Sequence, residues 1–77
     1  MWLNLKEEDK EIFIQNINEN RIKIYKTAIA ILKNEDDAND AIQEALLSAY
    51  KNWENLREKV YFSTWIIRIV INIISAN

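Results

Sequence analysis

The 77-residue sequence contains no glycine, proline, cysteine or histidine. Because Gly and Pro supply the backbone conformations of tight strand turns, their absence favours helices joined by short polar links over a β-sheet. Without Cys there is no disulfide framework, and without Cys and His there is no zinc site of the usual kind and no Cys–His or Ser–His nucleophile. The sequence therefore predicts an all-α protein, and we expect no cofactor and no metal.

Hydrophobic residues make up 49% of the chain, which is too high a share for a disordered segment. A chain of this length forms one domain over residues 1–77 with a thin core, since it buries only about 60% of its unfolded surface. The N-terminus has no signal-peptide pattern, and the apolar stretch WIIRIVINII is interrupted by Arg68 and Asn72. That stretch is shorter than the ~18 residues a membrane span needs, so we expect a soluble cytoplasmic protein without membrane insertion.

Apolar residues recur at helical spacing in four segments. The predicted helices cover about Glu7–Ile17, Arg21–Lys33, the segment from the N-cap Asn34 to Trp53, and Thr64–Ser75, with Ser63 as a second candidate N-cap. A polar link of about ten residues precedes the last helix. The prediction is a compact bundle of four short helices, with a core that includes Ile42, Leu46, Tyr50, Phe62, Trp65 and Ile69.

The third predicted helix carries a leucine on its polar side. Opposite its apolar stripe lie Asp40, Gln43, Glu44, Leu47 and Lys51. A single exposed leucine is common and needs no function. Surrounded by acids and an amide, however, Leu47 has the layout of a protein-binding hot spot.

Charge is unevenly distributed along the chain. Residues 1–50 carry six basic and ten acidic side chains, a balance of −4, and residues 51–77 carry four basic and two acidic ones, a balance of +2. Two interpretations stay open. The asymmetry is either chance, or the acidic part meets a basic protein surface while the basic end approaches phosphate.

Two stretches carry a resemblance to a known family. DDANDAIQEALLSAYKNW, followed by FSTWIIRIVIN, is similar to region 2 of bacterial RNA polymerase sigma factors of the extracytoplasmic-function type. The resemblance covers about residues 12–72. It lies in Asp36, Asp37, Ala38, Asp40, Gln43, Glu44 and Leu47, and then in Phe62, Trp65, Ile66, Arg68, Ile69 and Asn72.

The resemblance implies two binding surfaces. In this family the third helix binds the clamp helices of the largest polymerase subunit, which implies a polymerase contact at Asp40, Gln43, Glu44, Leu47 and Lys51. The following loop and last helix hold the non-template strand of the promoter minus-ten element. The residues implied there are Arg57, Lys59, Tyr61, Arg68 and Asn72.

Structural alternatives exist for several of these residues. Phe62 and Trp65 fit the core better than DNA, and Tyr61 fits either a stacking or a structural role. Arg68 could form an internal ion pair, and Arg57 and Lys59 could be ordinary solvated loop charges.

Beyond Asn72 the sequence departs from the family, which continues with polar and basic residues. The chain ends in IISAN, and the second promoter-recognition domain, region 4, is absent, so we expect either an isolated region 2 or a truncated gene product. The isoleucine-rich last helix is expected to expose an apolar patch that could meet the rest of the protein, an anti-sigma factor or a second copy. The main alternative function is a helical adaptor or anti-sigma-binding module without DNA binding. An enzyme using Asp36 and Asp40 is disfavoured because no other catalytic groups converge on them.

Overall fold

The computed structural model of the protein describes residues 6–76. Within that range it contains α1 (Glu7–Glu19), α2 (Arg21–Leu32), α3 (Glu35–Lys51) and α4 (Phe62–Ala76), and no strand. Two short 3₁₀ helices, η2 (Trp53–Asn55) and η3 (Lys59–Tyr61), lie in the connection between α3 and α4. The prediction of an all-α bundle of four short helices is confirmed.

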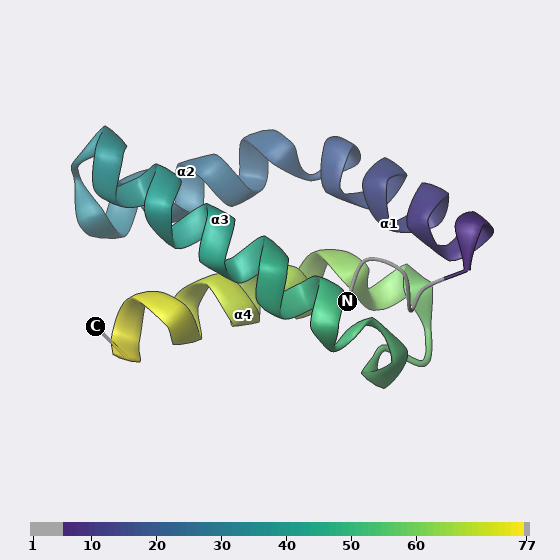
Figure 1. Ribbon diagram of the computed structural model, residues 1–77. Helices are drawn as coiled ribbons and strands as arrows, with labels where there is room; N and C mark the ends of the chain where they lie inside the picture. Colours follow the sequence, from purple (N-terminus) through teal and green to yellow (C-terminus); the bar gives the residue numbers. More distant parts are fainter. Residues whose placement is uncertain (1–5, 77) are drawn as a thin grey trace.

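The helices α2, α3 and α4 all pack against one another. In Figure 1, α1 and α2 follow one another along one side of the molecule, α4 lies on the other side, and α3 runs diagonally between them. The bend between α1 and α2 is at Asn20, whose backbone and side-chain N–H groups both donate to carbonyls of the last turn of α1. The chain lacks glycine for the turn after α2, and Lys33 adopts the left-handed conformation (φ 56°) that glycine usually supplies.

Asn34 caps α3 as the sequence predicts. Its side-chain oxygen accepts a hydrogen bond from the Asp37 backbone N–H at 2.9 Å. Glu35, Asp36 and Asp37 occupy the first turn, where their charges interact favourably with the helix dipole. These local interactions define the residue at which α3 begins.

Substituting this cap gives a measurable stability change. We expect Asn34→Ala to lower the free energy of unfolding by about 1 kcal/mol, because an Asp37 N–H loses its acceptor. Urea denaturation followed by circular dichroism measures the change. The control is Asn39→Ala, an exposed position on the same helix, which should leave stability unchanged or slightly raised. Equal effects of the two substitutions would contradict the capping role.

The start of α4 differs from the prediction. The helix begins at Phe62, directly after η3, so Ser63 lies inside the first turn and is not an N-cap. Its hydroxyl oxygen instead accepts a hydrogen bond from the Lys23 ammonium at 2.7 Å. This contact links α4 to α2, and a local sequence pattern does not encode a partner forty positions away. The end of α3 also differs slightly, because the helix stops at Lys51 and Trp53 belongs to η2.

Aromatic side chains from four elements form one cluster at the end of the bundle where α1 begins. Phe13 of α1 packs edge-on against Tyr50 of α3 (5.5 Å between ring centroids), Trp53 of η2 (5.3 Å) and Phe62 of α4 (6.3 Å). Trp65 completes the cluster through Trp53 and Phe62. Phe13 is the only residue of α1 that is buried, so this cluster attaches α1 to the other helices. Burial, with a smaller effect of the Glu7 charge, raises the pKa of the Tyr50 hydroxyl.

The centre of the core is built from smaller residues than the sequence suggested. Of the predicted core residues, Tyr50 and Phe62 are buried, whereas Ile42, Leu46, Trp65 and Ile69 are half-buried and pack around the centre. Alanines of α2 and α3 allow the helices to approach closely. The fully inaccessible side chains are Ala28, Ala38, Ala45, Ala49, Ile66 and Val70.

The apolar helix α4 is covered more completely than predicted. Val70 is buried and Ile67, Ile73 and Ile74 are half-buried, so only Ile71 (41% exposed) remains of the expected patch. Residues Lys59–Ala76 are also long and apolar enough to cross a membrane by length and composition, which corrects the shorter count made from WIIRIVINII. A single helix that meets these two criteria is weak evidence for a membrane span, because the core helix of a protein that spans no membrane can meet them too.

Candidate protein-binding and nucleic-acid interfaces

The first candidate surface is the α3 outer face, defined by Asp40, Gln43, Glu44, Leu47 and Lys51. All five side chains are exposed, and Leu47 retains 43% of its accessible surface. Within residues 6–76 none of these side chains makes a hydrogen bond or an ion pair. The opposite side of the helix is buried through its alanines, so α3 is held rigidly while these groups stay free for a partner.

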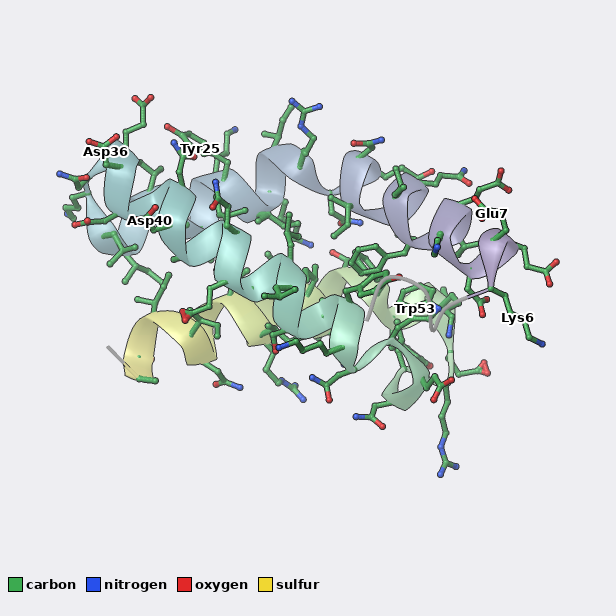
Figure 2. The ribbon with its side chains drawn as sticks, viewed as in Figure 1. Lys6, Glu7, Tyr25, Asp36, Asp40 and Trp53 are labelled. Atoms are coloured by element: carbon green, nitrogen blue, oxygen red, sulfur yellow. The ribbon has the colours of Figure 1, made fainter. Side chains whose placement is uncertain are left out.

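The charge of this surface is graded along the helix. Asp36 and Asp40 lie near the start of α3, at the end of the bundle opposite Trp53, as Figure 2 shows. Glu44 follows one turn after Asp40, and Lys51 is the only basic residue of α3 and lies in its last turn. A negative potential therefore surrounds Leu47 on its N-terminal side, which favours a partner with basic and apolar groups.

A shallow groove of about 490 Å³ runs between α2 and α3 beside this surface. Apolar side chains including Ile17, Ile22 and Leu46 line it, Arg21 and Lys26 contribute the charges, and none of its lining residues is acidic. The groove was not predicted, because Ile42 and Leu46, which line it, were expected in the core. A signal was present, since α2 contains no acidic residue between Arg21 and Lys33.

The second candidate surface is the connection between α3 and α4. Arg57 is exposed and makes no hydrogen bond or ion pair within the described part of the chain. Val60 and Tyr61 of η3 project from the molecule, with 81% and 63% of their surfaces accessible. Tyr61 was predicted as a stacking residue, whereas Val60 was missed because nothing in the sequence distinguishes it from a core valine.

Lys59 lies differently from the expectation that it meets phosphate. Its ammonium nitrogen is 4.4 Å from the centroid of the Trp53 ring and donates a hydrogen bond of 2.6 Å to the Leu56 carbonyl. The side chain is half-buried. Of the two loop cations, only Arg57 is therefore free to meet a phosphate without rearrangement.

Arg68 and Asn72 both lie on the exposed side of α4. They are four positions apart and therefore neighbours on one face of the helix. Arg68 makes no ion pair with any residue in the range 6–76, so the alternative of an internal ion pair is wrong for this part of the chain. Phe62 is buried and Trp65 half-buried, which agrees with a core role for both.

The geometry brings the two motif stretches into one packed unit, with α3 and α4 in contact. Residues 17–75 match sigma-70 region 2. The chain belongs to the sigma-70 region 2 family. No solved structure matches it significantly.

Curated relatives of this sigma region 2 domain are extracytoplasmic-function (ECF) sigma factors. It is 33% identical over 69 residues to the ECF RNA polymerase sigma factor SigW of Bacillus subtilis, covering 90% of this chain and 37% of that protein. It is 31% identical over 64 residues to the ECF RNA polymerase sigma factor SigM of Mycobacterium tuberculosis, covering 83% of this chain and 33% of that protein. The chain thus spans about a third of the length of these relatives, and the resemblance stated from the motifs is confirmed.

The motif residues of this sigma region 2 domain differ in burial, with Trp65 and Ile69 half-buried. Ala38, Phe62 and Ile66 are buried and hold the helices together. The polar members of the motif and Leu47 are exposed. A motif that served packing alone would not need these exposed side chains. The exposed members are Asp36, Asp37, Asp40, Gln43, Glu44, Leu47, Arg68 and Asn72.

Among residues 6–76 no group of three or more His, Cys, Asp or Glu side chains could hold a metal ion. Asp36 and Asp40, the pair considered for acid–base chemistry, are both exposed on the first turns of α3. Asp40 lines a small cavity of about 250 Å³ together with Asp37, Leu32, Ala41 and Ile74, whereas Asp36 is not among its lining residues.

Proposed function

We propose that this protein acts in bacterial transcription initiation as sigma region 2. Its α3 outer face binds the clamp helices of the largest subunit of RNA polymerase, and the α3–α4 connection with α4 engages the non-template strand of the promoter minus-ten element. The observation that carries the proposal is Leu47, an exposed leucine ringed by Asp40, Gln43 and Glu44 that have no partner within residues 6–76. It is supported by the family match and by the names of the relatives.

The polymerase contact follows from the chemistry of the α3 outer face. Acidic groups steer a basic partner toward the surface and increase the association rate. Leu47 supplies the apolar centre that becomes dehydrated on binding, and such a centre contributes most of the affinity of an interface. Because buried alanines already hold α3 in place, the entropy cost of ordering this helix on binding is small.

The DNA contact follows from the exposed residues of η3 and α4. Tyr61 offers an aromatic face on which an unpaired base can stack, and Val60 adds apolar surface next to it. Arg57 and Arg68 are free to meet phosphates, and Asn72 can hydrogen-bond a base edge or the backbone. The proposed role is non-enzymatic and requires no cofactor. We propose that the protein acts in the bacterial cytoplasm and that an anti-sigma factor is a further partner.

Calorimetry with an isolated clamp-helix fragment of polymerase tests the proposal. We expect binding in the micromolar range. We expect Leu47→Ala and Glu44→Lys each to weaken it by at least about thirtyfold, the effect of losing a hot-spot residue. Matched controls are Ile14→Ala and Glu11→Lys, which change exposed residues of α1 and should leave binding unaltered. Absence of binding by the folded wild-type protein would exclude the polymerase role.

A helical adaptor without DNA binding is the second candidate. It is favoured by the internal use of the Lys59 ammonium, which reduces the positive charge that the loop offers to DNA. Titration of a single-stranded oligonucleotide distinguishes the two functions. Binding to the clamp fragment without any binding to single-stranded DNA would favour the adaptor.

A further inference from the structure

The half-buried Lys59 joins the two ends of the α3–α4 connection. Its ammonium lies over the ring of Trp53 in η2 and donates to the carbonyl of Leu56, while its own backbone belongs to η3. A lysine ammonium over a tryptophan face gains electrostatic energy from the ring, and the gain increases when the contact is partly dehydrated. One side chain therefore connects η2, the extended residues that follow it, and η3.

The anchor to which Lys59 attaches is rigid. Trp53 is only 2% exposed and packs edge-on against Phe13, Phe62 and Trp65, with ring centroids 5.3 to 6.3 Å apart. Buried aromatic side chains packed on several sides have little freedom to reorient. A group held against Trp53 is thus held in a fixed place relative to α1 and α4.

Other contacts also hold the connection, because η3 runs directly into α4 at the buried Phe62 and packs against that helix. The backbone hydrogen bonds of the connection within the described residues are short-range: the N–H groups of Asn55, Leu56 and Tyr61 donate to the carbonyls of Asn52, Trp53 and Glu58, respectively. Leu56 and Glu58 are extended, and Arg57 between them is exposed. Lys59 adds the side-chain contact that joins η3 to Trp53 of η2 and to the Leu56 carbonyl.

We propose that Lys59 is a positioning residue that locks the α3–α4 connection onto Trp53, so that Val60 and Tyr61 project in a fixed orientation toward an unpaired base. Lys59 is not itself a phosphate contact. The lock is a property of the free protein, whereas its consequence for DNA rests on the proposed function. Arg57, two positions earlier and without a partner in residues 6–76, is the loop cation that meets phosphate.

Amide hydrogen exchange of the free protein tests the lock without DNA. Lys59→Met keeps the apolar stem and removes the ammonium, and we expect exchange at the Leu56 and Tyr61 amides to accelerate on the order of tenfold. Lys59→Arg keeps a cation that can stack and donate, so it should restore slow exchange. Arg57→Met is the matched control and should leave these amides unaffected. Unchanged exchange in Lys59→Met would overturn the lock.

The salt dependence of binding to a fluorescent oligothymidine distinguishes positioning from phosphate contact. Each lost phosphate contact lowers the slope of log affinity against log salt by about 0.7 for single strands. We expect Arg57→Met to lower the slope by that amount, and Lys59→Met to reduce affinity by roughly fivefold with the slope unchanged. A lowered slope in Lys59→Met would show a phosphate contact and overturn the positioning role. If the wild-type protein does not bind oligothymidine, the DNA part of the proposed function fails, and hydrogen exchange still decides whether the lock exists.

Discussion

Phe62→Ala is expected to lower the free energy of unfolding by about 3–5 kcal/mol, the cost of removing a large aromatic side chain from a packed core. Phe62 is 1% exposed and its ring contacts Phe13, Trp53 and Trp65. A protein of this size has a total stability of about 4–12 kcal/mol, so the substitution removes between about a quarter and all of that stability. The loss includes the edge-on ring contacts, which hold α1, η2 and α4 together at one point.

Urea denaturation followed by circular dichroism measures this effect. Tyr61→Ala is the matched control, because it removes an aromatic ring from the neighbouring position that is 63% exposed. That substitution should change stability by less than about 0.5 kcal/mol, as surface substitutions usually do. A Phe62→Ala protein as stable as Tyr61→Ala would show that the aromatic cluster does not hold the bundle together.

Ala45→Leu is expected to destabilise the protein by about 1–3 kcal/mol or more, because it overpacks a position in the core that has no accessible surface. Ala45 has no accessible surface, and Ala38 and Ala49 on the same side of α3 are equally inaccessible. A leucine cannot fit there unless α3 moves away from α2 and α4. Leucine is nevertheless a good helix former, so a loss of stability would come from packing alone.

Gln43→Leu is the control for this substitution. Gln43 lies on the exposed side of α3, two positions before Ala45, and a leucine there meets no neighbouring helix. The free energies of unfolding of the two variants, measured by urea denaturation, should therefore differ by more than about 1 kcal/mol. A neutral Ala45→Leu would mean that the helices are spaced more widely than the structure indicates.

The two faces of α3 together explain the motif that identifies the family. The buried alanines hold α3 against the other helices. The residues around Leu47 lie on the opposite side of the helix and remain exposed for a partner. A substitution on the buried face should therefore reduce both stability and partner binding. A substitution on the α3 outer face should reduce binding alone, which separates the two roles experimentally.

Sequence alone determined the features that depend on near neighbours. The absence of Gly and Pro and the helical spacing of apolar residues were enough for the all-α fold. The Asn34 cap was predictable because a cap joins residues only three positions apart. The exposed position of Leu47 followed from helical geometry, and the family followed from the two motifs.

Tertiary structure decided what depends on residues distant in sequence or on packing. The start of α4 and the contact of Ser63 with Lys23 depend on how α2 lies against α4. Ile42, Leu46, Trp65 and Ile69 were predicted as core residues and are only half-buried, because burial depends on how closely helices approach, and residue size does not report that distance. Lys59 was predicted as a loop charge that meets phosphate, but in the folded loop its ammonium contacts Trp53. The partner of a long cationic side chain depends on which groups the tertiary structure brings near it, and the local sequence does not specify these groups.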